Sequence, residues 1–522
     1  MDVARYLVVN PVGTATWDAG DTSYLRSLVA PGDEVQVASL PEGPEAVDSE
    51  ARWAEAEYGV TRLVDGLRAR GVFARGGEDG PAARDGGGPG DIAARRADGA
   101  GYDAVLINCF ADPGLFPGRE LLGVPVLGAG ETALALAPLF GEGVAVLAPD
   151  DATASMFARY ARRLGLDRDI AGFFPIGVPV AALERRPELT AERVIDAARR
   201  ARRRTGCGVV VLGCTGLAPL AARVASVLEK EGLTVLEPLA LAFRAAEVLV
   251  RLGLCHHRGG MFAACRDGPG LGSSGIFPPD PGLPGVFYSG PRDRTGPDPE
   301  PVDVLLLNAV VSPGLLSWVP GYARSVVSPW TRVRVADISD GPPCIETFCQ
   351  EAWARPGLVR TALQAGPFHA AVVNCFADPA VRALREATGA PVLGPAESSC
   401  RLALLLGRRF GVVSTGSNAG GWTEMQVREM GLAARCAGAV GIEVGVLALR
   451  EDRGATVGAI VQEARRLTER GAEVIVLGCT GMAELAHEVA GQLGMPVLEP
   501  LAVALNLADL VARTRSRQGQ SR

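Results

Sequence analysis

The chain has 522 residues, of which 48% are hydrophobic, and a formal net charge of −7. At about 150 residues per domain, this length predicts three or four compact units. The acidic balance gives no electrostatic reason to expect nucleic acid as a partner. The sequence contains no uncharged apolar run of about 18 residues, so no membrane span is predicted. Lys230, the only lysine, lies in a polar helix end and is badly placed for a Schiff base or a phosphate loop.

The first residues of the chain lack the basic region, long apolar stretch and cleavage site of a secretory signal, so we expect a cytoplasmic protein. The 11 cysteines lie mostly in apolar runs, and their spacings differ from those of a small disulfide scaffold. Reduced thiols are therefore expected.

Two short sequence words each occur twice. NCFADP occupies residues 108–113 and 374–379, and LGCTG occupies 212–216 and 477–481. They indicate a tandem duplication, with a first repeat at 1–250, a Pro/Gly-rich linker at 251–302 and a second repeat at 303–522. An insert at about 71–101, rich in Gly, Ala, Asp and Arg, has no counterpart in the second repeat and predicts a mobile loop.

Short apolar runs alternate with helical segments in both repeats. This alternation predicts an α/β fold, with parallel sheets flanked by helices. Strands are expected at 6–9, 35–38, 104–107, 124–127, 144–147 and 209–212, and again at 304–307, 333–336, 370–373, 391–393, 410–413 and 474–477, with helices such as 191–204 and 456–470.

Each repeat carries a pair of cysteines in the shared words, namely Cys109 with Cys214 and Cys375 with Cys479. All four fall where a strand is expected to end, and sites in parallel sheets form at that edge. A helix N-terminus there lowers the pKa of a thiol. Cysteine is more often a small core residue. However, these cysteines stand at turns, within the longest segments that the repeats share, so we predict a chemical role for them.

Two thiols that face each other across a carbon suit one reaction especially well. A thiolate removes the proton beside a carbonyl, and a thiol delivers a proton to the opposite face, which inverts the centre without a metal. A thiol pKa of about 8.5 is close enough to neutrality for tuning. Backbone N–H groups at the turns, with Thr215 or Thr480, would stabilise the enolate oxygen.

The words NPVGT at 10–14, NCFADPGL at 108–115, PVLG at 125–128 and LGCTG resemble the hydantoin racemase branch of the aspartate/glutamate racemase superfamily. The resemblance covers both repeats, leaving out the insert and the linker. It implies two pseudo-symmetric flavodoxin-like subdomains in each repeat, one cysteine from each at the cleft, and no cofactor. It assigns proton transfer to the two cysteine pairs. The residues that it places around the sites are Asn10, Asn108, Thr215, Asn308, Asn374 and Thr480.

Each repeat departs from the family pattern in a different place. Small hydroxyl residues are favoured after the mid-domain strand, and Ser414 and Thr415 supply them in the second repeat, whereas the first has Ala148 and Pro149. Conversely, the second repeat lacks the NPxxT opening. Activity in one repeat only, or different substrates for the two, both stay open.

The leading hypothesis is an isomerase, a racemase or epimerase acting alpha to a carbonyl of a small hydantoin, amino acid or related acid. A maleate-type cis-trans isomerase with a nucleophilic cysteine remains an alternative. So does a binding protein in which one or both repeats are catalytically degenerate. The assembly is equally open, between a homo-oligomer and a pseudo-dimer within one chain. Cys255, His256, His257 and Cys265 match no familiar zinc spacing, and no metal site is predicted.

Overall fold

The computed structural model describes residues 4–30, 32–69, 73, 101–257, 259, 261–262, 300–312, 316–417 and 419–519. Most of the expected insert at about 71–101 and of the expected linker at 251–302 lies outside the described residues. We propose the boundaries 1–250, 251–302 and 303–522 for the two repeats and the segment between them.

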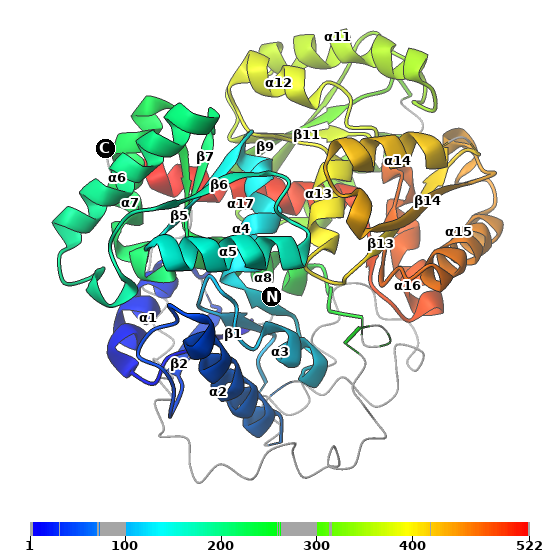
Figure 1. The fold of residues 1–522 in the computed structure, drawn as a ribbon. Coiled ribbons are helices and arrows are strands. Elements are labelled where there is room, and N and C mark those ends of the chain that lie inside the picture. The colour runs from blue at the N-terminus through cyan, green and yellow to red at the C-terminus, as the bar shows by residue number, and fades with distance from the viewer. Residues whose placement is uncertain are drawn as a thin grey trace.

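Each repeat builds two parallel sheets of four strands (Figure 1). The strand orders are β2-β1-β3-β4 and β6-β5-β7-β8 in the first repeat, and β10-β9-β11-β12 and β14-β13-β15-β16 in the second. The four orders are equivalent, which confirms the expected tandem α/β fold with two similar subdomains in each repeat. The strands are β1 (Arg5–Asn10), β2 (Glu34–Ser39), β3 (Ala104–Ile107), β4 (Val126–Gly128), β5 (Val144–Ala148), β6 (Ile170–Pro175), β7 (Val209–Leu212), β8 (Thr234–Leu236), β9 (Val302–Asn308), β10 (Thr331–Asp337), β11 (Ala370–Asn374), β12 (Val392–Leu393), β13 (Phe410–Thr415), β14 (Cys436–Ile442), β15 (Val474–Leu477) and β16 (Val497–Leu498).

Helices cover both faces of the sheets, as parallel sheets require. Consequently β3, β7, β11 and β15 are buried along their whole length, whereas the edge strands β2, β6, β10 and β14 are partly exposed. The helices are α1 (Asp18–Leu28), α2 (Glu50–Ala69), α3 (Leu115–Leu121), α4 (Ala129–Leu136), α5 (Asp151–Leu164), α6 (Pro187–Thr205), α7 (Ala218–Leu228), α8 (Pro238–Arg251), α10 (Val319–Val326), α11 (Phe348–Gln364), α12 (Val381–Thr388), α13 (Pro395–Ala403), α14 (Ala419–Glu429), α15 (Arg453–Glu469), α16 (Ala486–Leu493) and α17 (Pro500–Gly519).

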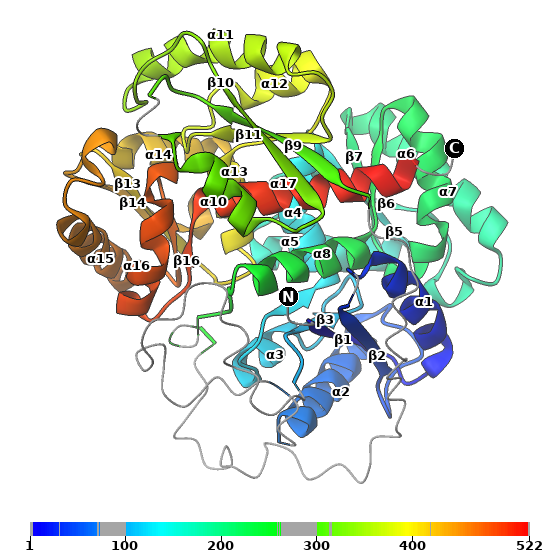
Figure 2. The ribbon, with the colours of Figure 1, turned by 180° about the vertical axis from the view of Figure 1, so that it is seen from behind.

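The two repeats pack against each other through four helices. Helix α4 of the first repeat meets α13 of the second, and α8 meets α17. Figure 2 shows α17 running through the middle of the molecule beside α8. One hydrophobic core contains residues of all four helices. Arg251 donates to Asn506 Oδ1 at 2.8 Å, and Arg401 forms an ion pair with Asp169 at 2.9 Å, both across the repeats. The repeats therefore share one core, and we propose that the chain is its own pseudo-dimer.

The described start of the expected linker is packed against the first repeat. His256 and Phe262 are buried, and the His256 Nε2 atom accepts the backbone N–H of Val126 at 2.8 Å. The buried Phe262 ring and the hydrogen bond of His256 thus hold the described residues of this segment against the body of the molecule. Cys265 lies outside the described residues.

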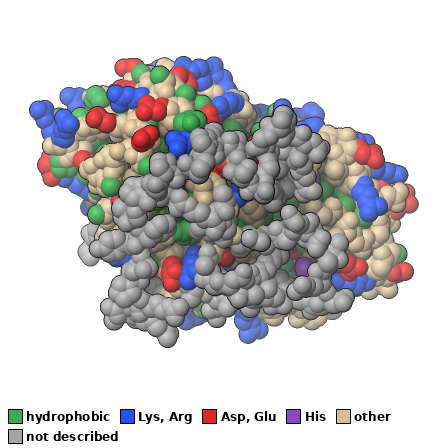
Figure 3. Space-filling model, turned by 90° about the horizontal axis from the view of Figure 1, so that it is seen from below, with side chains coloured by type: hydrophobic (Ala, Val, Ile, Leu, Met, Phe, Trp, Pro, Cys, Tyr) green, Lys and Arg blue, Asp and Glu red, His purple; other side chains and the backbone are tan. Residues whose placement is uncertain are grey.

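Two surface properties concern possible partners. No helix within the described ranges is long and apolar enough to cross a membrane. On the face that Figure 3 shows, acidic and basic side chains of the described residues are interspersed.

The aspartate of each NCFADP word anchors its loop to the next helix. Asp112 accepts the N–H groups of Gly130 and Glu131 at 2.9 and 2.6 Å, at the start of α4. Asp378 accepts the corresponding groups at the start of α13 at 3.0 and 2.9 Å. Both aspartates have left-handed backbone conformations, with φ values of 50° and 53°. The NCFADP segment therefore has a structural role in addition to supplying a cysteine.

The glycine of the PVLG word leaves room for this anchor. A Cβ atom at Gly394 would come within 2.1 Å of the Asp378 carboxyl carbon. We expect Gly394→Ala to lower the free energy of unfolding by about 1–3 kcal/mol, because the aspartate must move. Gly458→Ala is the matched control, because nothing lies within 4 Å of its Cβ position in α15. The control variant should have a free energy of unfolding that is higher by about 0.5–1 kcal/mol, measured by urea titration. Equal midpoints for the two variants would contradict the account.

Candidate active site

The predicted cysteines stand at the carboxyl ends of inner strands. Cys109 follows β3, which neighbours β1 where the strand order reverses, and this reversal is the usual ligand site of an open parallel sheet. Cys214 follows β7 and is the N-cap residue of the short helix Thr215–Leu217. In the second repeat, Cys375 follows β11, and Cys479 caps the helix Thr480–Leu485. The strand-to-helix turns predicted for LGCTG are confirmed.

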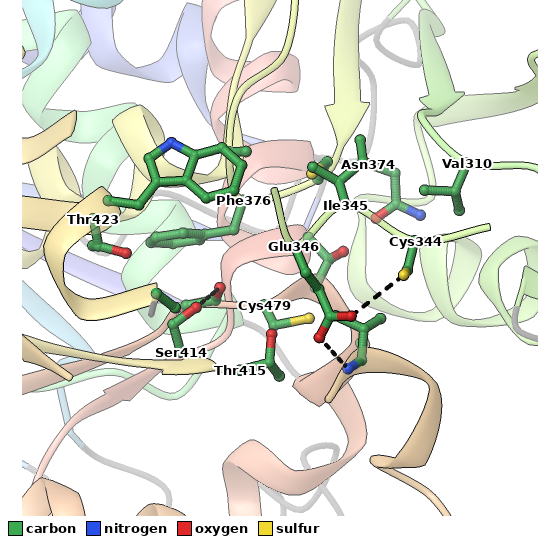
Figure 4. Close-up of a pocket in the computed structure, with 18 of the residues that line it drawn as sticks. Val310, Cys344, Ile345, Glu346, Asn374, Phe376, Ser414, Thr415, Thr423 and Cys479 are labelled. Atoms are coloured by element: carbon green, nitrogen blue, oxygen red, sulfur yellow. Dashed lines mark hydrogen bonds between the residues drawn. The ribbon is translucent and has the colours of Figure 1, made fainter. Parts of the chain in front are cut away.

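A cavity of ≈ 100 Å³ in the second repeat brings Cys375 and Cys479 together, although they are 104 residues apart in the chain. Figure 4 shows its wall from both subdomains, with Asn374 on one side and Ser414, Thr415 and Cys479 on the other. The lining residues are Val310, Leu316, Trp318, Cys344, Ile345, Glu346, Asn374, Cys375, Phe376, Ala377, Ser414, Thr415, Ala419, Trp422, Thr423, Gln426, Val446, Gly478, Cys479, Thr480 and Gly481.

Asn308 stands behind this wall and orients Asn374. Asp337 accepts the Asn308 amide N–H at 2.6 Å, and the Asn308 oxygen accepts the Asn374 amide N–H at 2.8 Å. Because an ionised carboxylate only accepts, this relay fixes which way both amides point. The Asn374 oxygen is buried and has no hydrogen-bond partner among the described residues. The second site therefore presents an unpaired acceptor next to Cys375.

The first repeat builds the same relay from other elements. Asp18 and Asp21 of α1 accept from the Asn10 amide at 2.8 and 3.0 Å, and the Asn10 oxygen accepts from Asn108 at 2.6 Å. Asn108 also donates to Asp21 at 3.0 Å, and its own oxygen is buried and unpaired within the described part of the chain. Ser39 pairs with Asn10 in the sheet as Asp337 pairs with Asn308. The carboxylate that holds the asparagine relay thus belongs to α1 in the first repeat and to β10 in the second.

Burial raises the pKa of the Cys109, Cys214, Cys375 and Cys479 thiols, that of Cys214 to about 11. This differs from the expected lowering at helix N-termini, because desolvation outweighs the backbone dipoles. The dipoles are present nevertheless. The N–H groups of Ala111 and Gly216 face the Cys109 and Cys214 sulfurs and favour their thiolates. These N–H groups therefore oppose the effect of burial on the pKa of the two thiols.

The predicted hydroxyl residues have distinct places. Thr415 hydrogen-bonds to Cys479 and lowers its pKa against the larger effect of burial, whereas the Ser414 hydroxyl donates to the Gly478 carbonyl at 2.7 Å. Thr480 lines the cavity. In the first repeat, Thr215 donates to the backbone oxygen of Asn108 at 3.2 Å, which ties the two cysteine loops together.

Replacing Thr415 by valine is expected to reduce kcat/KM at the second site by about tenfold at pH 7. Loss of the hydroxyl removes a hydrogen bond that lowers the pKa of Cys479, so less thiolate is then available. The measurement is substrate inversion as a function of pH, in which the alkaline rise should move to higher pH. Thr423→Val, at another lining position, is the matched control. If Thr415→Val and Thr423→Val lowered kcat/KM equally at every pH, the effect of Thr415→Val would be merely steric.

Sequence reasoning missed three polar residues around the sites. Glu346 lines the second cavity, accepts the Val446 N–H at 3.0 Å and contacts the Cys344 sulfur at 3.4 Å (Figure 4). Burial raises the pKa of Cys344 to about 11. Asp21 lies in the first site, where burial raises its pKa to about 6. The available signals were the acidic stretches after the Gly-Pro turns and after NPVGT.

Comparison with known proteins places the chain in a family. The sequence model of the Asp/Glu/hydantoin racemase family matches residues 7–246 and 320–508. A hydantoin racemase of Paenarthrobacter aurescens is 33% identical over 210 residues, which are 40% of this chain and 89% of that protein. A hydantoin racemase of Pseudomonas sp. (strain NS671) is 32% identical over 192 residues, 36% of this chain and 77% of that protein. The solved allantoin racemase of Pseudomonas fluorescens is 28% identical, with a TM-score of 0.39 and coverage of 40% and 91%.

The duplicated α/β fold and these matches define the chain as an enzyme, an isomerase. It belongs to the Asp/Glu/hydantoin racemase family, as a tandem fusion of two copies.

Proposed function

We propose that the chain is a cofactor-independent racemase of small hydantoins or related cyclic ureides, and that both repeats are active. The observation that carries this proposal is the unpaired amide oxygen of Asn108 and of Asn374, one beside each first cysteine. A buried acceptor without a partner costs free energy until a ligand donates to it. The ring N–H groups of a ureide are such donors.

The charge of the second cavity supports a neutral substrate. Glu346 is the only acidic residue in its described wall, which contains no Lys, Arg or His. A second N–H group of a ureide fits this carboxylate. Maleate would instead bring two carboxylates towards Glu346, with repulsion and no cation in the described wall to compensate. A free amino acid could place its ammonium group at Glu346, but its carboxylate would find no cation in that wall. The cavity therefore favours a hydantoin over the dicarboxylate of the alternative isomerase.

The proposed reaction uses one thiol on each side of the substrate carbon. One cysteine, as thiolate, takes the proton from the carbon alpha to the carbonyl, so that the C–H bond breaks and an S–H bond forms. The electron pair moves onto the carbonyl oxygen as an enolate. The thiol of the other cysteine then delivers its proton to the opposite face. The product is the mirror-image centre, and the second thiol becomes the thiolate for the reverse direction.

The test uses the full chain in D₂O with single enantiomers of 5-methylhydantoin and 5-benzylhydantoin, and with maleate, L-aspartate and L-glutamate. We expect inversion of at least one hydantoin, with solvent deuterium incorporated at C5, at a rate above the enzyme-free blank. Isomerisation of maleate, or inversion of the amino acids without any hydantoin reaction, would contradict the proposal. Binding of hydantoins without exchange would identify a degenerate binding protein.

A further inference from the structure

The rims of the two sites differ in chemical character. At the second site, Phe348 is the first residue of α11 and is 56% exposed, and its ring lies 4.7 Å from the ring of Trp422 on α14. Met425, one helical turn after Trp422, is 44% exposed. We call these three residues the apolar collar. Because Trp422 also lines the cavity, the apolar collar continues its wall outwards.

The equivalent positions of the first repeat carry an ion pair. Glu50 is the first residue of α2, as Phe348 is of α11. Arg159 is the eleventh residue after the end of β5, at Ala148, and Met425 is the eleventh after Ser414. The Arg159 guanidinium lies 2.7 Å from the Glu50 carboxylate. The first rim is therefore charged where the second rim is apolar.

Both rims lie next to the cysteine loops. In the first repeat, Trp53, one turn after Glu50, donates its indole N–H to the Ala111 oxygen at 2.9 Å. In the second, Gln426, which follows Met425, donates to the Phe376 oxygen at 3.1 Å. A substituent on a carbon held between the cysteines would thus extend past these positions towards solvent.

We propose that the apolar collar is the subsite for an apolar substituent on the reacting carbon, so that the second site takes aryl or branched alkyl hydantoins. The first site takes hydantoins with polar substituents, which the ion pair of Glu50 and Arg159 contacts. Exposed aromatic rings gain free energy when an apolar group of a ligand covers them and removes them from water. This inference rests on the proposed function, and it gives the duplication a purpose, namely two specificities in one chain.

The experiment exchanges the rims. The second site is isolated by Cys109→Ser, and its kcat/KM is compared for 5-benzylhydantoin and 5-methylhydantoin. We expect a benzyl-to-methyl ratio of about ten or more, since apolar groups in such subsites discriminate by 10–200-fold. The double change F348E/M425R, which imports the ion pair, should bring the ratio close to one. An unchanged ratio would overturn the inference.

The reciprocal change is the matched control. In a chain whose first site is isolated by Cys375→Ser, E50F/R159M should raise the benzyl-to-methyl ratio severalfold. Failure to raise it would show that these positions do not decide specificity. The four rim positions, Glu50, Arg159, Phe348 and Met425, are exposed, and thermal melts check that the variants fold.

A calorimetric arm separates this inference from the proposed function. If the parent chain inverts no hydantoin, the proposed function fails, and the apolar collar is judged by binding alone. An affinity for 5-benzylhydantoin that falls about tenfold in F348E/M425R, with 5-methylhydantoin as reference, supports the subsite. Equal affinities of the parent and the variant overturn it.

Discussion

Replacing Cys375 by serine is expected to abolish inversion at the second site and to leave the first site active. A serine hydroxyl has too high a pKa to act as the base or to return a proton, and general acid–base groups contribute about 10²–10⁴-fold. Cys109→Ser should have the reciprocal effect. The combined variant should therefore lose inversion by about a thousandfold or more at both sites, measured by polarimetry.

The remaining cysteines make this prediction more specific. The combined variant retains Cys214 and Cys479. If each acts on one side of the substrate as proposed, exchange of the C5 proton in D₂O should persist for one enantiomer without inversion. Cys349→Ser, which changes an exposed thiol at the start of α11, is the control and should leave both reactions unaffected. Full activity in the combined variant would remove the two-thiol mechanism.

The second large effect is a steep dependence of the rate on pH. Burial raises the pKa of Cys214 to about 11, so only about one molecule in ten thousand carries its thiolate at pH 7. At substrate concentrations below KM, inversion at the first site, isolated by Cys375→Ser, should rise by about tenfold per pH unit between pH 7 and 9. A rate that is flat above pH 7 would mean that the thiolate is already formed.

The same raised pKa sets an upper limit for that measurement. The unfolded chain loses its thiol protons from about pH 8.5, whereas the folded first site keeps the Cys214 proton until about pH 11. Folding stability therefore falls as the pH rises through this window, because the unfolded state binds fewer protons. Circular dichroism at each pH distinguishes a true rate increase from loss of the folded protein.

Strong local patterns of apolar residues in the sequence were sufficient to predict the fold. Apolar runs such as 104–107 and 474–477 became buried inner strands at the predicted residues, because a strand covered on both faces needs an unbroken apolar run. The expected strand at 124–127 begins at Val126 instead. Pro125 offers only its carbonyl oxygen, which accepts the Val105 N–H at 2.9 Å.

Local sequence patterns were insufficient to predict how the two sites differ in structure. The lost NPxxT opening indicated a defect, yet Asp337 replaces Asp18 in holding the asparagine relay from a different element. The ion pair of Glu50 and Arg159 joins residues 109 positions apart, and no periodicity links them. The direction of the thiol pKa shift was also mispredicted, because desolvation depends on every element packed around the sulfur.

The sequence by itself determined the duplication, the α/β class, the family and the four cysteines, since each is written in contiguous words and in the spacing of apolar residues. Only the tertiary structure decided which groups share a cavity, how the amide oxygens of Asn108 and Asn374 point, and which rim is charged. These properties arise from side chains that meet across subdomains, where hydrogen-bond direction and burial depend on distance in space and not on distance along the chain.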